Sequence, residues 1–211
     1  ALQQVRARGP GGAAGLGVAL RTSRQVALAR VIEYECAHER LVTDEALAHL
    51  EVVTQTMTAL AELALDRACQ QACADLNERH GRPLDEQGQP VPLWIIGMGK
   101  LGARELNVSS DIDLIYVYGQ DGETSGLPDG RGKLSNHEYF ARAVKAIYAL
   151  VGETTEHGLV FRVDLALRPH GNSGPPVVSL AALEDYLQLH GREWERFAWL
   201  KSRIVAPRAS V

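Results

Sequence analysis

The sequence predicts an α+β fold in which helices come first and a small mixed β-sheet follows. Apolar residues recur every three to four positions between residues 44 and 79, which is the spacing of an amphipathic helix. Beyond residue 92 the pattern changes to short apolar runs, bounded by glycine-rich turns and alternating with further helical stretches. The order helices, then β–β–α–β–α–α, suits an α+β domain with a small mixed sheet.

The first part of the chain is expected to be a helical layer behind a flexible start. Residues 9–17 read GPGGAAGLG, so residues 1–17 are expected to form a flexible glycine-rich segment. Two long helices are expected next, over residues 18–40 and 44–79. Gly81 and Pro83 end the second helix. Residues 18–92 are therefore expected to pack as a helical segment on the domain that follows.

The second part, residues 93–211, is expected to form the domain that carries the chemistry. Its strands are expected at residues 93–96, 112–118 and 158–167. One helix is expected to start at Ser135 and run to about residue 151. Two more helices are expected over residues 179–190 and 192–204. Ser135 and Glu138 form a capping-box pair at the start of the first of these helices. The long Gly/Asp-rich loop 119–135 has a length more typical of functional or mobile loops.

Composition argues against several classes of protein. The 211 residues carry a net charge of −4 and are 45% hydrophobic, which is ordinary for a globular protein. Nucleic-acid binders usually carry a basic stripe, so no nucleic-acid partner is expected. No window approaches 18 apolar residues, so no membrane span is expected. Three cysteines, an odd number, suit a reducing cytoplasm better than a disulfide framework.

The most informative feature is a pair of carboxylates two positions apart at the start of an expected strand. Residues i and i+2 of a strand point to the same face, so Asp111 and Asp113 would lie roughly 6–7 Å apart along the chain. Two anions this close repel unless a cation lies between them, and a divalent metal shared with substrate phosphates is a common solution. The pattern predicts Mg²⁺-dependent phosphoryl or nucleotidyl transfer; the alternative is a capped turn followed by a solvated strand edge.

A third acid lies in the expected strand that reads FRVDLALR. Arg162, Asp164 and Arg168 would share one face of that strand. An acid flanked by apolar residues is costly to bury unless it is paired or bound to metal. A sheet that brings Asp164 beside Asp111 and Asp113 would form a three-carboxylate site for one or two Mg²⁺ ions, which can clamp the attacking and leaving oxygens. In the alternative, Asp164 only pairs with one of the two arginines.

A glycine-rich loop precedes the first two acids. Residues 97–102 read GMGKLG and match G-x-G-x-x-G after a strand, the dinucleotide-binding pattern. A parallel crossover needs a dozen or more residues, usually with a full helix, and residues 98–111 leave too little room for one. We expect instead a loop whose N–H groups approach phosphate oxygens. Lys100 would neutralise phosphate, or else remain a solvated surface lysine.

Further polar residues flank this loop. Ser109 and Ser110 would donate hydrogen bonds to a phosphate or simply cap the turn, and Asn107 would orient the loop or an acid. Three cations are candidate phosphate contacts or ordinary salt-bridge partners: Arg162, Arg168 and Lys201.

Three segments resemble the glutamine synthetase adenylyltransferase family, bifunctional enzymes that attach AMP to glutamine synthetase and remove it: GMGKLGARELNVSSDIDLI, FRVDLALRPHGNSGPPVVSLAALEDYLQ and GREWERFAWLKSRI. The resemblance is strong from about residue 93 to residue 204. It implies a polymerase-β-like nucleotidyltransferase domain, of which such enzymes have two. The C-terminal, adenylylating half typically reads YGKLGG-x-EL-G-x-GSDLDL, and the N-terminal, adenylyl-removing half reads GMGKLGG-x-ELN-x-SSDIDL. Five residues of this chain side with the N-terminal half: Met98, Asn107, Ser109, Ser110 and Ile112.

The resemblance also implies roles for individual residues. Asp111, Asp113 and Asp164 would be metal-binding catalytic acids that hold Mg²⁺, most simply as two ions. AMP or ADP and inorganic phosphate would be the other ligands. Their expected contacts are Gly99, Lys100, Gly102, Ser109, Ser110, Arg162 and Arg168. Ala103 departs from the family, which usually has glycine there, but this change removes no functional group.

The expected function is removal of AMP from a glutamine synthetase tyrosine by phosphorolysis, as part of nitrogen-assimilation control in the cytoplasm. The first alternative is the forward reaction, transfer of AMP from ATP to that tyrosine. The second is a non-catalytic module that binds nucleotide or a PII signalling protein. The resemblance also implies that the chain is a C-terminally truncated fragment of a longer enzyme, whose partners are glutamine synthetase and PII.

Overall fold

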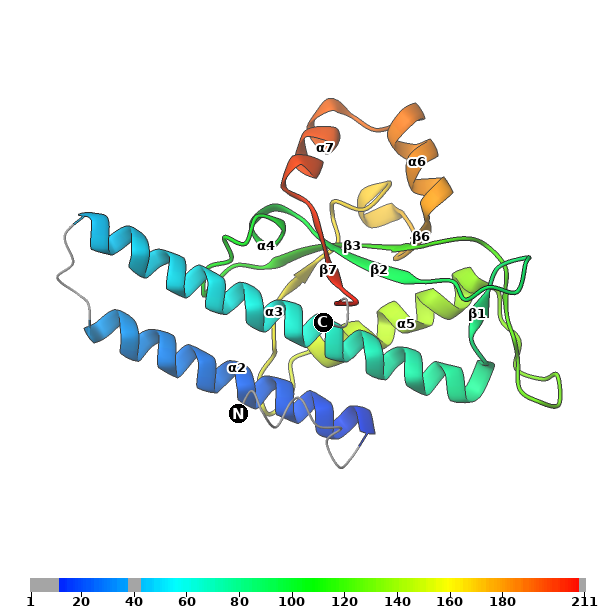
Figure 1. The fold of residues 1–211 in the computed structure, drawn as a ribbon, viewed down its shortest axis with the longest axis horizontal. Helices are drawn as coiled ribbons and strands as arrows, with labels where there is room; N and C mark the ends of the chain where they lie inside the picture. Colours follow the sequence, from blue (N-terminus) through cyan, green and yellow to red (C-terminus); the bar gives the residue numbers. More distant parts are fainter. Residues whose placement is uncertain (1–11, 38–42, 209–211) are drawn as a thin grey trace.

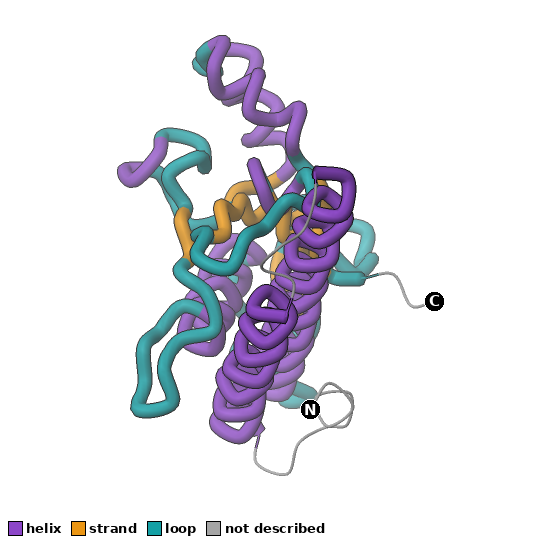
Figure 2. Tube along the Cα trace, turned by 90° about the vertical axis from the view of Figure 1, so that its left-hand side faces the viewer, coloured by secondary structure: helices purple, strands orange, loops and turns teal. Residues whose placement is uncertain are grey.

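The computed structural model describes residues 12–37 and 43–208, and places a small twisted sheet between two helical layers (Figure 1). Two long antiparallel helices and a shorter one lie on one side of the sheet: α2 (Gly12–Ala37), α3 (Thr43–His80) and α5 (Asn136–Val151). Figure 2 shows from a second direction that α2 and α3 run alongside each other. Two short helices lie on the other side: α6 (Leu180–Leu189) and α7 (Glu193–Ala198).

The main sheet is mixed and has the strand order β5-β3-β2-β7. Its central pair is antiparallel, formed by β2 (Leu93–Gly97) and β3 (Ile112–Tyr118). On one side β2 pairs antiparallel with β7 (Arg203–Ala206). Two very short strands pair parallel with β3, namely β5 (Val163–Asp164) and β6 (Val178–Ser179). The mixed α+β architecture expected from the sequence is therefore confirmed.

A two-stranded sheet and three short helical turns complete the described residues. β1 (Pro83–Leu84) pairs antiparallel with β4 (Glu123–Thr124) inside the long 119–135 loop. The helical turns are α4 (Gly99–Gly102), η1 (Gly171–Ser173) and η2 (Trp199–Lys201).

Several expected boundaries shift in the structure. Helix α2 begins at Gly12, so residues 12–17 are helical rather than flexible, while residues 1–11 lie outside the described part. Of the strand expected at 158–167, only Val163–Asp164 forms a strand, while Gly158 makes an isolated bridge with Thr155. The helix expected at 192–204 is α-helical from Glu193 to Ala198 and continues as a 3₁₀ turn to Lys201. Beyond residue 201 the prediction is wrong, because the chain becomes extended at Ser202 and β7 pairs with the free edge of β2.

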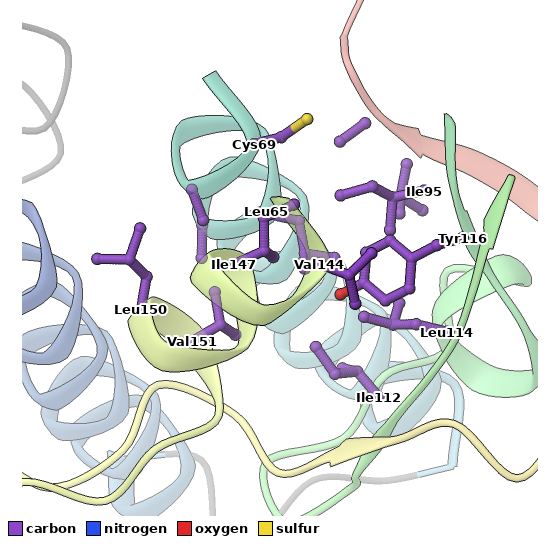
Figure 3. Packing of buried hydrophobic residues seen from close by; sticks show 14 of the residues in the cluster. Leu65, Cys69, Ile95, Ile112, Leu114, Tyr116, Val144, Ile147, Leu150 and Val151 are labelled. Atoms are coloured by element: carbon purple, nitrogen blue, oxygen red, sulfur yellow. The ribbon is translucent and has the colours of Figure 1, made fainter. Parts of the chain in front are cut away.

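Both faces of the sheet are buried, which explains why residues 112–118 are almost continuously apolar. On the first face Ile112, Leu114 and Tyr116 pack against α3 and α5, and Figure 3 shows Leu65 and Val144 from those helices meeting them. On the second face a smaller cluster gathers apolar residues of α6 and the sheet: Met98, Ile115, Val117, Val178 and Leu183. The odd-numbered residues Ile115 and Val117 of β3 therefore face α6. Because alternate residues of a strand point to the same face, Asp113 projects from that face as well.

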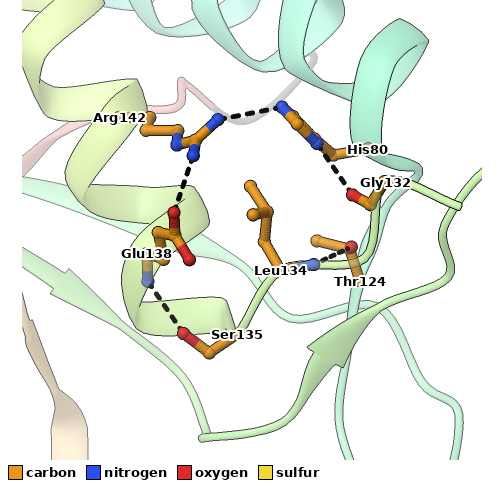
Figure 4. A network of polar contacts seen from close by, with 7 residues as sticks. All are labelled: His80, Thr124, Gly132, Leu134, Ser135, Glu138 and Arg142. Atoms are coloured by element: carbon orange, nitrogen blue, oxygen red, sulfur yellow. Dashed lines mark hydrogen bonds and ion pairs between the residues drawn. The ribbon is translucent and has the colours of Figure 1, made fainter.

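Polar contacts tie the long loop to the helices (Figure 4). The Nδ1 atom of His80 lies 2.8 Å from the carbonyl oxygen of Gly132, and Arg142 bridges His80 and Glu138. The Ser135 hydroxyl accepts a hydrogen bond of 3.2 Å from the backbone N–H of Glu138, so the Ser135 half of the predicted capping box is confirmed, whereas the Glu138 carboxylate accepts from Arg142. The loop 119–135 is thus anchored at several points to α3 and α5.

Among the helices of the described residues, none combines the length and the apolar character needed to cross a membrane.

Candidate active site

The register of two parallel strands brings two predicted acids together. Asp113 in β3 lies directly opposite Asp164 in β5. Residues opposite each other in paired strands project from the same face of a sheet. Asp111 lies one residue before β3 and two before Asp113, so its position falls on the same face of the strand as Asp113. Residues 51 positions apart in the sequence therefore converge at one end of the sheet.

The pKa of Asp113 reflects the closeness of the other two acids. Burial raises the pKa of the Asp113 carboxyl above its ordinary value, and the negative charges of Asp164 and Asp111 raise it further. The Lys100 ammonium opposes these effects and lowers the pKa. A bound cation would relieve the repulsion, so the donor set has the chemistry of a hard divalent metal site.

Two of the three acids already have partners within the chain. Arg162 donates from Nε to Oδ1 of Asp111, and from Nη2 to the carbonyl oxygen of Ser109 at 2.8 Å. Oδ1 of Asp164 accepts a hydrogen bond of 2.7 Å from the backbone N–H of Ala166. Across the described ranges, no three His, Cys, Asp or Glu side chains are already gathered as a metal cluster. A metal bound by all three acids would either take the free Oδ2 of Asp111 or displace Arg162 from Oδ1.

A charged cavity of about 510 Å³ opens beside these acids. Its lining is formed by Gly99, Lys100, Asn107, Ser109, Ser110, Asp111, Asp113 and Arg162. Lys100 donates to the Ser110 hydroxyl at 3.3 Å, and that hydroxyl donates to Oδ1 of Asn107 at 2.6 Å. Asn107 thus orients the serine loop, one of the two roles that the sequence left open. Carboxylates and hydrogen-bond donors face one space, which suits a phosphate-bearing ligand.

The glycine loop is built differently from a dinucleotide-binding turn. Strands β2 and β3 are antiparallel, so they are not joined by a parallel crossover. The prediction that GMGKLG is not a dinucleotide-binding turn is therefore confirmed. Gly99 has φ +54°, a left-handed conformation that favours glycine. The backbone N–H of Met98 donates to the carbonyl oxygen of Asp113 at 2.9 Å, which fixes the loop against β3.

The two other glycines of this loop have packing roles. A Cβ atom on Gly102 would overlap the backbone carbonyl of Lys201, and one on Gly97 would come within 2.8 Å of side-chain atoms of Leu101 and Val205. By contrast, a Cβ atom on Gly99 would lie 3.4 Å from Oδ2 of Asp113, an ordinary contact. Gly102 therefore supports the loop from behind, whereas Gly99 borders the acids.

These contacts predict a difference between two matched substitutions. Gly102→Ala should destabilise the protein by more than about 1 kcal/mol, since the backbone of η2 must move. Gly99→Ala should cost about 1 kcal/mol through its positive φ, and should impair activity more than stability. Denaturant unfolding and activity of both variants would check this. Equal loss of stability and activity in the two would contradict it.

Arg168 lies apart from the cavity lining. Its guanidinium donates to the carbonyl oxygens of Leu165 at 2.8 Å, Asn172 at 3.2 Å and Gly174 at 3.3 Å. Arg168 therefore stabilises the 165–174 loop. Of the cations expected to contact phosphate, Lys100 and Arg162 line the cavity. Lys201 pairs with Glu105 at 2.9 Å, the salt-bridge alternative of the sequence analysis.

One arginine contact with the segment before β5 carries no signal in the sequence. Arg24 of α2 lies over the ring of Phe161, the neighbour of Arg162, with 5.8 Å between guanidinium carbon and ring centre. Nothing in the local sequence distinguishes it from the other arginines of this helix. Only the docking of α2 reveals its position.

Comparisons with known proteins agree with the motif pattern. Residues 11–211 match the family model described as glutamate-ammonia ligase adenylyltransferase. The chain is 48% identical over 193 residues to the bifunctional glutamine synthetase adenylyltransferase/adenylyl-removing enzyme of Burkholderia pseudomallei, covering 92% of this chain and 20% of that protein. It is 50% identical over 191 residues to the enzyme of the same name from Chromobacterium violaceum, covering 90% and 20%.

The chain thus spans about a fifth of the length of these curated relatives. The family match covers nearly all of the chain, including every acid and cation of the cavity. The chain therefore belongs to the glutamate–ammonia ligase adenylyltransferase family, a family of nucleotidyl-transferring enzymes.

Proposed function

We propose that this chain carries the adenylyl-removing site, a nucleotidyltransferase site of the polymerase-β type that releases AMP from a tyrosine of glutamine synthetase. The observation that carries the proposal is the pairing of Asp113 with Asp164 beside a cavity lined by Lys100 and Arg162. The SSDID motif and Asn107 favour removal over attachment, since they match the pattern of the adenylyl-removing half.

The chemistry follows from the charges around the cavity. An oxygen of inorganic phosphate attacks the AMP phosphorus, the bond from phosphorus to the tyrosine oxygen breaks, and ADP and a free tyrosine form. In this proposal Lys100 binds phosphoryl oxygens, while the Ser110 hydroxyl, whose proton goes to Asn107, positions the Lys100 ammonium. A phosphate dianion needs no general base, because it carries no proton on the attacking oxygen.

Mg²⁺ held by Asp113, Asp164 and Asp111 would neutralise charge on the phosphorus oxygens. The residues fit this role by donor chemistry and by the repulsion that raises the pKa of Asp113. Arg162 would then exchange Asp111 for a phosphoryl oxygen, which keeps the guanidinium paired.

A direct assay tests the direction of the reaction. Adenylylated glutamine synthetase, Mg²⁺ and inorganic phosphate are incubated with the protein, and ADP is measured. ADP that forms only with phosphate supports the proposal. AMP incorporated from ATP into unmodified glutamine synthetase, without phosphorolysis, would assign the forward reaction instead. Nucleotide or PII binding without turnover in either direction would indicate the regulatory module. A PII partner and a cytoplasmic location stay predictions.

A further inference from the structure

One lysine of the charged cavity is held by a hydroxyl group rather than by a carboxylate. Lys100 lines the cavity and is exposed, and its ammonium donates to Oγ of Ser110 at 3.3 Å. Within the ranges that the structure describes, no carboxylate forms an ion pair with Lys100. Because a lysine side chain loses much rotamer freedom when it is ordered, the position of this ammonium depends on the Ser110 hydroxyl.

The hydrogen bonds of Ser110 have a fixed direction. An ammonium can only donate, so the Ser110 hydroxyl accepts from Lys100 with one of its lone pairs. Its single proton goes to Oδ1 of Asn107, at a distance of 2.6 Å. The Asn107 amide therefore turns a lone pair of Ser110 toward Lys100. Without this acceptor the hydroxyl would be free to rotate, and Lys100 would lose its partner.

The loop that carries Asn107 and Ser110 is held by contacts that do not involve the Asn107 side chain. The backbone N–H of Ser110 donates to the backbone carbonyl oxygen of Asn107 at 3.4 Å. Arg162 donates from Nη2 to the carbonyl oxygen of Ser109 at 2.8 Å, and Leu106, just before the loop, is fully buried in the core. Truncation of the Asn107 side chain should therefore leave the path of the loop unchanged.

The Lys100 ammonium also acts on the acid cluster. Its positive charge lowers the pKa of Asp113, against the effects of burial and of the other two acids. Lys100 thus contacts the serine loop and lies near the acids at the same time. A phosphoryl group that binds beside these acids would meet an ammonium with two N–H donors still available for charge-assisted hydrogen bonds.

We propose that Asn107 is a positioning residue for phosphate recognition, which acts through Ser110 to hold the Lys100 ammonium against a phosphoryl oxygen of the ligand. The geometry that carries this proposal is the chain of two hydrogen bonds from Lys100 to Ser110 and from Ser110 to Asn107. That the ligand is inorganic phosphate, rather than a phosphate group of the nucleotide, rests on the proposed function.

A double-mutant cycle on the full-length polypeptide tests this chain of contacts. Affinities for inorganic phosphate and for AMP are measured separately, with Mg²⁺ and without protein substrate, from the shift of the thermal unfolding midpoint. Asn107→Ala should weaken phosphate binding about fivefold to tenfold, the effect of one hydrogen bond, and should keep the midpoint of the ligand-free protein. In a Lys100→Ala background the same substitution should have no further effect. Asn172→Ala, at an exposed asparagine outside the cavity lining, is the control and should bind phosphate as the unmodified protein does.

The outcomes separate the role of Asn107 from the direction of the reaction. Loss of phosphate affinity that Lys100→Ala masks, with a raised KM for phosphate and kcat largely kept, supports both. The same masked loss in a protein that forms no ADP from adenylylated glutamine synthetase supports the positioning role and overturns phosphorolysis. A masked loss for AMP but not for phosphate overturns the assignment to inorganic phosphate.

Three results would overturn the positioning role itself. The first is an equal effect of Asn107→Ala with and without Lys100, because Asn107 would then contact the ligand directly or only shape the loop. The second is a lowered unfolding midpoint of the ligand-free Asn107→Ala protein with unchanged affinities. The third is binding of neither ligand by the unmodified protein, or binding that Lys100→Ala leaves unchanged.

Discussion

Asp113→Asn is expected to abolish adenylyl transfer in either direction while making the metal-free protein more stable at neutral pH. Asp113 lies opposite Asp164 and is half-buried, so its carboxylate is central to the acid cluster. Loss of one group that stabilises transition-state charge commonly costs about a hundredfold to a thousandfold in rate. Asp111→Asn should show the same loss of activity, since both acids line the cavity.

The gain in stability follows from the sign of the pKa shift. Burial and the neighbouring carboxylates raise the folded-state pKa of Asp113 above its unfolded value. The folded state therefore holds this proton more tightly, a stabilisation that is complete below the unfolded pKa and is lost as pH rises through the folded pKa. At neutral pH the ionised carboxylate is strained by repulsion, and the neutral amide of Asn removes that strain.

Denaturant unfolding of both proteins from acidic to neutral pH, without divalent metal, measures this effect. The difference between Asp113→Asn and the unmodified protein should grow with pH. Added Mg²⁺ should stabilise the unmodified protein and leave the variant unchanged. Asp129→Asn is the control, because Asp129 is paired with Arg131 in the distant 119–135 loop and should keep full activity. An active Asp113→Asn protein would refute the assignment of the acid cluster.

Arg21→Ala is expected to destabilise the protein by about 3 kcal/mol, since the substitution removes three hydrogen bonds from a charged donor. The buried guanidinium donates hydrogen bonds to the carbonyl oxygens of Ala149 in the last turn of α5, and of Glu153 and Gly158 in the loop that follows it. A cation at a helix C-terminus is favourable, and hydrogen bonds from a charged group contribute about 1.5–3 kcal/mol each, non-additively. Alanine would remove this donor from all three carbonyl groups, although the carbonyl oxygen of Gly158 would keep the backbone N–H of Thr155 at 3.0 Å.

Chemical denaturation and limited proteolysis would measure the loss of stability and the release of α2. The matched control is Arg30→Ala, whose exposed ion pair with Glu33 should contribute less than about 1 kcal/mol. If Arg21→Ala and Arg30→Ala unfold at the same denaturant concentration, the anchoring role of Arg21 is wrong.

Local sequence patterns were sufficient to predict a buried strand and the start of a helix. Residues 112–118 form a buried strand because both of its faces are apolar, and α5 starts at Ser135 because its hydroxyl caps the first turn. The antiparallel β2–β3 pair follows from the short connection between the strands. The motif around Asp111 and Asp113 identified the family before any geometry was known, since it needs only residue types at fixed spacing.

Long-range pairing decided the rest. Residues 203–206 form a strand only because the edge of β2 offers hydrogen bonds, and Glu123–Thr124 pairs with β1 across about forty residues, so neither has a local signal. Gly99 and Gly102 belong to one motif in the sequence, but their roles differ in the structure. Gly102 packs against the backbone of Lys201, whereas Gly99 lies beside the carboxylate of Asp113.

The residue types of the proposed site, its acids and its glycine–lysine loop, can thus be identified from the sequence alone, because such motifs are defined by residue type and spacing. The partners of those groups are set by tertiary structure alone. Arg162 reaches Asp111, and Arg24 reaches Phe161, only when β5 pairs with β3 and Arg21 anchors α2. Electrostatic interactions depend on distance in space, and the folded chain creates those distances.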